Sequence, residues 1–295
     1  MVNFMKHSTG LGYSGGRGYV TWLVVLLLVV QVSCAFAQTE TLSDGNSSVT
    51  LSLTDPGSGM DNWTVDGQNQ LSQQWFYYRI GNTGTAASVG SLTLASVSQP
   101  SASSLNTTYL SPGQFSLQVV YSLVGGAAGS GTADLSEQIK IQNLTGASLA
   151  FNFFQYANFQ LGGPSMASSQ VVQLETNRKG LYNEALVTSG NISLSENVDS
   201  AISPGANNGE ADVVPNTLNR ITGTAGYNLD NVTNSGPGNT TWALQWTNGI
   251  AANGTMIISK DLNIAGVPEP ATWSLISLGL VAYGVRRRYF SRRQS

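Results

Sequence analysis

The side chains that most often perform catalysis or bind transition metals are nearly absent from this chain. Its 295 residues include one histidine, His7, and one cysteine, Cys34, and both precede residue 38. A histidine-activated nucleophile, a cysteine nucleophile and a zinc site of Cys/His type each need residues that the rest of the chain lacks. We therefore expect no catalytic activity, no cofactor and no disulfide in the segment that follows residue 37.

Acidic side chains could still bind a metal ion. Asp55, Asp61 and Asp66 lie within twelve residues of one another, among glycines, and they supply the oxygen ligands that calcium prefers. Their spacing does not match an EF-hand loop. Asx turns, in which a carboxylate accepts hydrogen bonds from nearby backbone, are the favoured interpretation. We predict no metal site and keep calcium at these three residues as the alternative.

Paired carboxylates could also hydrolyse glycosidic bonds, because such a pair leaves no local signature in a sequence. The glutamates available for this are Glu175, Glu184, Glu196 and Glu210. No motif surrounds any of them. A secreted, carboxylate-dependent glycoside hydrolase is therefore the less favoured alternative.

Aromatic side chains offer a third kind of site, since a row of exposed rings can stack against sugars. Strands favour aromatic residues, however, and a core must bury them, so packing in a core is the favoured role for each one. The candidates are Trp63, Trp75, Tyr77, Tyr78, Phe154, Tyr156, Trp242 and Trp246.

The most informative stretch is the C-terminal one, which has three parts in order. Val267-Pro268-Glu269-Pro270 comes first, and its prolines prevent a strand or a helix interior from continuing. Residues 271–285 follow without a charge, which predicts a membrane-spanning helix of about 22 Å that needs its flanking residues to complete the span. The last part is basic and predicts a cytoplasmic end; its arginines are Arg286, Arg287, Arg288, Arg292 and Arg293.

This order of proline motif, apolar run and arginine cluster resembles the PEP-CTERM sorting signal of Gram-negative bacteria. The resemblance implies that exosortase, a membrane-embedded cysteine protease, removes the tail and sends the protein to the cell surface or to the exopolysaccharide matrix of a biofilm. It covers only the last 29 residues. It implies destination and processing, and it brings no activity to the rest of the chain.

The N-terminal end has the features of a secretory signal peptide. Lys6 and Arg17 precede an apolar run at residues 20–32, and Ala35 and Ala37 occupy the positions that signal peptidase reads, so a mature start at Gln38 is predicted. A retained N-terminal helix and lipidation of Cys34 are the alternatives. The general secretion machinery and signal peptidase are the expected partners.

The segment between the two ends is acidic. Fifteen of the 16 acidic residues but only six of the 13 basic residues fall within 38–267, which gives this segment a net charge of −9. An acidic surface with scattered bases argues against nucleic acid or an anionic membrane as the partner of this segment. Exopolysaccharide is a possible partner.

The same segment predicts an all-β fold. Apolar residues alternate with polar ones in many short runs, for example at Phe115, Leu117, Val119 and Tyr121, and glycine- and asparagine-rich links separate the runs. This pattern is typical of a single antiparallel β-sandwich of jelly-roll or immunoglobulin-like type. We expect a short helical turn at 133–138, a central strand buried on both faces at 73–79, and long loops with short edge strands at 185–234.

The predicted organisation is thus a signal peptide at 1–37, a β-sandwich ectodomain at 38–265 and a sorting signal at 266–295. The predicted function is that of an exported surface or matrix protein that exosortase processes from an inner-membrane-anchored precursor. The alternatives are a carbohydrate-binding module of the extracellular matrix, the glycoside hydrolase, and a single-pass membrane protein that is never cut.

Overall fold

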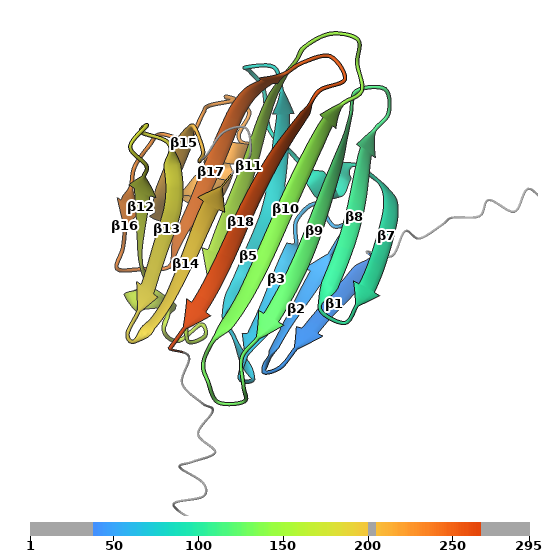
Figure 1. The fold of residues 1–295 in the computed structure, drawn as a ribbon. Helices are drawn as coiled ribbons and strands as arrows, with labels where there is room; N and C mark the ends of the chain where they lie inside the picture. The colour runs from blue at the N-terminus through green and yellow to red at the C-terminus, as the bar shows by residue number, and fades with distance from the viewer. Residues whose placement is uncertain (1–37, 200–204, 267–295) are drawn as a thin grey trace, which may run out of the picture. The chain divides into compact units, whose positions relative to one another are not determined.

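The computed structural model describes residues 38–199 and 205–266, and two antiparallel sheets form a sandwich there (Figure 1). Each sheet has nine strands, and one short α-helix, α1 (Asn216–Thr222), accompanies them among the described residues. The predicted antiparallel β-sandwich is confirmed. The predicted signal peptide at 1–37 and the predicted membrane helix at 271–285 lie outside the described residues.

Sheet A follows the order β1-β2-β3-β5-β11-β17-β15, with β4 paired to β3 and β6 paired to β5. Its strands are β1 (Thr39–Asp44), β2 (Ser47–Ser52), β3 (Gly59–Val65), β4 (Gln68–Asn69), β5 (Leu71–Ile80), β6 (Ala87–Ser88), β11 (Leu149–Phe159), β15 (Asn208–Val213) and β17 (Thr240–Ile250).

Sheet B follows the order β16-β12-β13-β14-β18-β10-β9-β8-β7. Its strands are β7 (Thr93–Ser101), β8 (Ser104–Ser111), β9 (Phe115–Gly125), β10 (Ala133–Asn143), β12 (Val171–Thr176), β13 (Tyr182–Ser189), β14 (Ile192–Asp199), β16 (Asn234–Ser235) and β18 (Thr255–Ala265). Two short 3-10 helices, η1 (Val89–Ser91) and η2 (Ala167–Ser169), lie in the connections.

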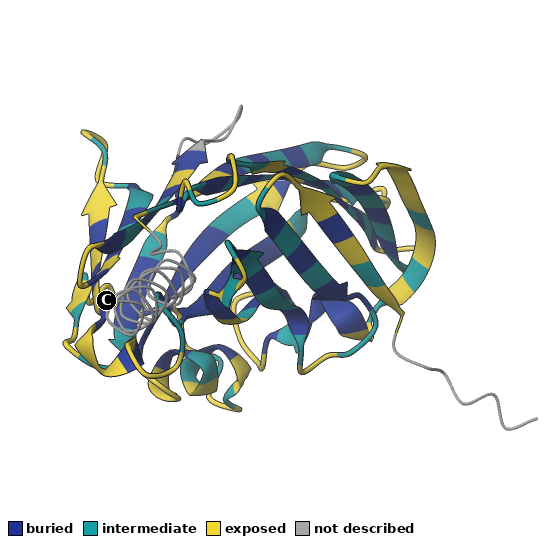
Figure 2. Cartoon of the chain, turned by 90° about the horizontal axis from the view of Figure 1, so that it is seen from below, coloured by how far each residue is buried: buried dark blue, intermediate teal, exposed yellow. Residues whose placement is uncertain are grey.

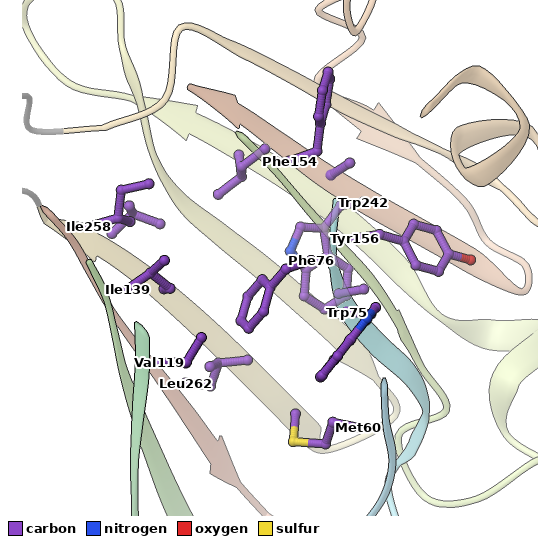
Figure 3. Packing of buried hydrophobic residues seen from close by; sticks show 14 of the residues in the cluster. Met60, Trp75, Phe76, Val119, Ile139, Phe154, Tyr156, Trp242, Ile258 and Leu262 are labelled. Atoms are coloured by element: carbon purple, nitrogen blue, oxygen red, sulfur yellow. The ribbon is translucent and has the colours of Figure 1, made fainter. Parts of the chain in front are cut away.

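The core lies between the two sheets and follows from the period-two alternation of the sequence. Along β9 and β10 every second residue is buried, and the residues between them are more exposed. Figure 3 shows Phe76 and Trp242 of sheet A among Val119, Ile139 and Ile258 of sheet B. Seen from below, buried residues lie along the strands of both sheets, and exposed residues lie in the connections and along outer strands such as β7 (Figure 2).

Sheet A is buried on its outer face as well. Phe154 and Tyr156 alternate along β11 with the inward-facing Phe153 and Gln155, yet both are almost inaccessible to solvent. Helix α1 contacts β11 and β17 there, and it buries Ile221. The expected strand buried on both faces is confirmed as part of β5, because Trp75 and Phe76 are both buried.

One local prediction was wrong and a second was wrong in part, since the short edge strands expected at 185–234 are present as β15 and β16 at the edges of the two sheets. Residues 133–138 form the first half of β10, since pairing with β9 and β18 on both sides satisfies their backbone groups and overrides the local helical preference. Residues 185–234 include most of β13 and all of β14, and β14 is an interior strand between β13 and β18. The polar residues of β14 suggested an edge strand, but its inward positions are occupied by Ile192, Leu194, Glu196 and Val198.

No helix among residues 38–199 and 205–266 has the length and apolar character needed to cross a membrane.

Candidate functional site

The aromatic residues considered as a sugar-binding platform are packed in the protein instead. Seven of the eight are buried, and Tyr78 is half-buried and packs against the core. Trp63 stacks edge-on against Phe159, with ring centroids 5.9 Å apart, and its indole nitrogen donates to Ser47. The favoured prediction of core packing is confirmed, and these residues form no exposed aromatic row.

The three aspartates considered for calcium do not form a common site. Asp55 and Asp66 accept hydrogen bonds from the protein, and Asp61 lies within β3. The Asp55 carboxylate accepts hydrogen bonds from the Gly57 N–H and the Ser58 hydroxyl, both at 2.8 Å, which is the expected Asx turn. These two hydrogen bonds lower the pKa of Asp55. Partial burial raises the pKa of Asp61, which lies within β3. No cluster of three or more His, Cys, Asp or Glu side chains suited to a metal occurs among the described residues.

Asp66 instead connects the two sheets. It lies in the turn between β3 and β4, and its carboxylate accepts hydrogen bonds from the Gly129 N–H at 2.7 Å and the Gly131 N–H at 2.8 Å, both in the β9–β10 connection. The Asn46 side-chain amide donates to it as well, at 2.8 Å. Burial acts to raise the pKa of Asp66, but these three hydrogen bonds outweigh it and lower the pKa.

Two of the four glutamates considered for hydrolysis cannot reach a substrate. Glu196 and Glu210 are completely buried, and each forms an ion pair, Glu196 with Lys260 and Glu210 with Arg220. Glu175 and Glu184 lie opposite each other on β12 and β13. A hydrolytic pair needs room for a sugar between two carboxylates, and the two buried residues provide none.

The sandwich contains a buried cluster of charges that sequence reasoning missed. Lys260 of β18 lies between Glu137 of β10 and Glu196 of β14, and its Nζ atom is 2.9 Å from Glu137 Oε2 and 2.8 Å from Glu196 Oε1. All three side chains point inward from neighbouring strands of sheet B, and their side chains are inaccessible to solvent. We call these three residues the charge triad.

Sheet A supplies the remaining partners of the charge triad. Gln74 Nε2 of β5 donates to Glu137 Oε1 at 2.7 Å, while Trp242 Nε1 of β17 and Gln155 Nε2 of β11 donate to Glu196 Oε2 at 2.6 and 3.2 Å. The triad therefore joins three adjacent strands of each sheet through hydrogen bonds across the core. Lys260 Nζ also lies 5.6 Å from the centroid of the Phe76 ring.

Burial and the neighbouring charges act in opposite directions on the pKa values of Glu137 and Lys260. Burial raises the pKa of Glu137, and the positive charge of Lys260 only partly opposes that effect. For Lys260, burial acts to lower the pKa, but the two adjacent carboxylates outweigh it and raise the pKa. Because no solvent or substrate reaches these groups, the arrangement can hold the two sheets in register but cannot transfer a proton to a ligand.

The sequence did contain a signal for the charge triad. Each of its residues occupies an inward position of an otherwise apolar alternation: Glu137 between Leu135 and Ile139, and Lys260 between Ile258 and Leu262. Glu196 lies between Leu194 and Val198 in the same way. A charged side chain at a buried position of a strand needs an opposite charge nearby. In this protein the three strands provide such charges to one another.

A groove of about 520 Å³ lies along the outer side of sheet B. The side chains that line it include Asn183, Asn197, Ser136, Ser259 and Asp261. Partial burial raises the pKa of Asp261, and the neighbouring Asp134 carboxylate raises it further. Amide, hydroxyl and carboxyl groups of this kind can form hydrogen bonds with a polar ligand, but none of them is a nucleophile activated by a base.

The sorting signal begins where the last strand ends. β18 finishes at Ala265, and Gly266 has a left-handed backbone with φ of +81°. A side chain at Gly266 would approach the backbone oxygen of Asn191, in the β13–β14 turn, to within 2.2 Å. Glycine is thus required at this position, where the chain leaves the sandwich. Ala35, Ala37, Val267, Pro268, Glu269, Pro270 and the five arginines lie outside the described residues.

Comparison with solved structures identifies a shared fold. A candidate aldose 1-epimerase from Escherichia coli K12 has a TM-score of 0.53 and 12% identity, over 77% of this chain and 98% of that chain. A galactose mutarotase-like protein from Lactobacillus casei has a TM-score of 0.48 and 8% identity, over 77% and 100%. At 12% identity, the similarity to the Escherichia coli protein shows a shared fold and nothing about activity.

Comparison of the sequence with protein families identifies the C-terminal segment as a sorting motif. No curated protein matches the chain. Residues 266–288 match the PEP-CTERM protein-sorting motif, which begins at the glycine that ends the sandwich and includes the proline motif and the apolar run. The chain is therefore a PEP-CTERM sorting domain-containing protein.

Proposed function

We propose that this protein is a non-catalytic component of the cell surface or the exopolysaccharide matrix, released from an inner-membrane-anchored precursor when exosortase cuts near Pro268. The observation that carries the proposal is the position of the sorting motif, which starts at residue 266, directly after β18. All 18 strands found in the described residues precede the motif. A cut within it therefore leaves the whole sandwich with the exported product.

The construction of the sandwich supports a non-catalytic role. Its last strand, β18, lies in the interior of sheet B between β14 and β10, so the body is completed only when the chain reaches the sorting motif. The charge triad uses two glutamates and a lysine to join the sheets, and Glu210 is paired with Arg220. Residues 38–266 contain neither histidine nor cysteine.

The two other functions have less support. A carbohydrate-binding module of the kind expected would need exposed aromatic rings, and the eight rings considered are buried or half-buried. A glycoside hydrolase would need two accessible carboxylates across a cleft, and Glu196 and Glu210 are completely buried.

Intact-mass measurement of the protein recovered from the cell surface and the medium tests the proposal. We expect a product that starts at Gln38, ends near Pro268 and lacks all five C-terminal arginines. Replacing Pro268 and Pro270 with alanine should leave the full tail on the protein and retain it in the membrane fraction. Replacing Pro164, which lies in an exposed connection, is the matched control and should leave processing unchanged.

An unprocessed protein in exosortase-positive cells would contradict the proposal and favour a permanent single-pass membrane protein. Conversion of a polysaccharide by the purified product, lost when Glu175 or Glu184 is replaced by glutamine, would contradict the non-catalytic role.

A further inference from the structure

The end of the sandwich at which β18 finishes is made of connections that pack against one another. The β13–β14 turn lies beside Gly266, and the β9–β10 connection lies beside the start of β10, which pairs with the end of β18. The β11–β12 connection contacts the β13–β14 turn through Met166, which lies against Gly190. We call this end the exit face; it consists of residues 45–46, 66–67, 102–103, 126–132, 160–170, 190–191, 214–215, 236–239 and 266.

The connections of the exit face carry few charges. Asp66 is the only charged residue in them, and three hydrogen-bond donors surround its carboxylate. The strand ends next to these connections add Asp44, Asp134 and Asp212. The remaining residues of the connections are mostly glycine, alanine, serine, asparagine and proline. By contrast, the described connections at the opposite end of the strands include Asp55, Arg178, Lys179 and Asp230.

The exit face is also where exposed apolar side chains gather. Nine large hydrophobic residues are exposed in the described part of the chain, and five of them lie in the exit face or at the strand ends next to it. These five are Val124, Met166, Val171, Val213 and Val214. Exposed apolar residues that collect at one end of a domain indicate a contact surface.

The chain outside the structure indicates what that surface contacts. Four residues lie between Gly266 and Ala271, the first residue of the uncharged apolar run, so the Cα atoms of these two residues are at most about 18 Å apart. While the tail is attached, the exit face must therefore lie close to the bilayer. The body carries a net charge of −9 between residues 38 and 267, so lipid phosphates repel it and the contact has to come from its apolar side chains.

We propose that the exit face binds the lipid bilayer surface in the uncleaved precursor, with Met166 and its apolar neighbours in the interfacial region. The proposal rests on the proposed function, because it requires a membrane-anchored precursor. It adds that the sandwich stands end-on upon the membrane, with β18 leading directly to the cleavage motif. Removal of the tail then breaks the tether. The remaining contact of a few apolar side chains is too weak to retain the product at the membrane.

Depth-sensitive quenching tests the contact in the full-length precursor. Cys34→Ser removes the only native thiol, and single cysteines at Ser165 in the exit face and at Ala147 at the opposite end, both exposed, receive a fluorophore. The precursor is placed in phosphatidylcholine vesicles that contain a spin-labelled lipid. The two positions lie at opposite ends of strands that are about 35 Å long. We expect quenching at 165 to be several times that at 147.

A longer tether distinguishes binding of the exit face to the bilayer from proximity that the short tether imposes. With about 20 Gly/Ser residues inserted after Gly266, the body could move roughly 25 Å away, and we expect quenching at 165 to persist. Met166→Asp should then abolish it. Leu144→Asp is the matched control, since Met166 and Leu144 are both 38% exposed, and it should change nothing. Near-ultraviolet circular dichroism of each variant verifies that the sandwich is folded.

Four results would overturn the proposal. Loss of quenching with the long tether would mean that the tether alone holds the body near the membrane. Lipid-independent self-quenching at 165 would indicate that the exit face pairs with a second copy of the chain. Failure of the precursor to float with the vesicles would overturn the proposed function as well, whereas a precursor that floats but shows no quenching at 165 would overturn only the contact.

Discussion

At the scale of single residues, the charge triad is the most demanding feature of the protein. Taking three charged side chains out of water costs several kcal/mol for each, and close ion pairs recover this only when their remaining hydrogen bonds are also satisfied. Gln74, Gln155 and Trp242 provide those hydrogen bonds from the opposite sheet. The triad therefore defines which strands of the two sheets face each other, since an exchange of partners would leave a buried charge unpaired.

Removal of the lysine should be the most harmful change in the triad. Lys260→Met leaves Glu137 and Glu196 buried together without a positive charge, and we expect a loss of about 3–5 kcal/mol in the free energy of unfolding. Urea unfolding followed by tryptophan fluorescence measures it. Lys140→Met is the control, because Lys140 lies on the exposed side of β10 and should change stability by less than about 0.5 kcal/mol.

The triple variant Glu137→Gln, Glu196→Gln, Lys260→Met removes all three charges and retains side chains that can form hydrogen bonds. It should recover part of the stability lost in Lys260→Met. If the triple variant is the less stable of the two, unpaired charge is not what Lys260→Met exposes, and the triad does not act as described.

At the scale of elements, β5 shows how one strand sets the geometry around it. It is buried on both faces, so Trp75 on its outer side needs space between the neighbouring connections. The space comes from Gly59 at the start of β3, whose φ is +71° and where an added Cβ would lie 2.2 Å from the indole ring of Trp75. The Trp75 indole nitrogen then donates to Ser88 at 3.0 Å and ties β5 to η1.

Gly59→Ala should therefore be costly for two separate reasons. A positive φ costs a residue with a Cβ about 1–2 kcal/mol, and displacement of Trp75 adds about 1–3 kcal/mol more. Gly113→Ala isolates the first cost, because Gly113 has the same φ of +71° with nothing within 4 Å of the added Cβ. Thermal unfolding of both variants measures the difference. An equal loss of stability in the two variants would show that Trp75 can move aside without a loss of free energy.

At the scale of the whole molecule, the two sheets are joined at the exit face by hydrogen bonds as well as by the core. Asp66 belongs to a turn of sheet A and accepts two backbone hydrogen bonds from the β9–β10 connection of sheet B. The same connection also pairs with the β1–β2 turn, where the Gly126 N–H donates to Asn46 Oδ1 at 2.8 Å. These contacts order a glycine-rich connection that has no regular structure of its own.

The Asp66 contacts predict a dependence of stability on pH. Because the pKa of Asp66 is below its ordinary value of 3.8 in the folded protein, its contribution to stability is present above that value and is lost as the pH falls through the lowered pKa. The difference in unfolding free energy between the wild type and Asp66→Asn should be largest above about pH 5 and should shrink toward pH 2.

Amide hydrogen exchange checks the location of this effect. Exchange at Gly129 and Gly131 should accelerate in Asp66→Asn, while amides in the middle of β10 remain protected. A difference in stability that stays constant with pH would mean that the Asp66 carboxylate is not the group responsible.

Much of this protein could be predicted from local patterns. The alternation along Phe115–Tyr121 predicted a strand because a pleated strand points successive side chains to opposite faces. The run at 73–79 predicted a strand buried on both faces, and the burial of Trp75 and Phe76 confirms it. The sorting motif was predicted for a similar reason, since prolines, an apolar run and arginines act within one short continuous stretch.

The partners of residues distant in sequence could not be predicted in this way. Glu137 and Lys260 are 123 positions apart, and only the antiparallel pairing of β10 with β18 places them opposite each other. Period-two alternation shows which face a side chain occupies, but not which strand lies beside it, because pairing depends on the free energy of the whole sandwich. The sequence by itself determined the class of fold, the acidic character of the body and the sorting signal. Tertiary structure alone decided that the charge triad lies in the core and that β18 ends at the exit face, since both follow from the order of strands in sheet B.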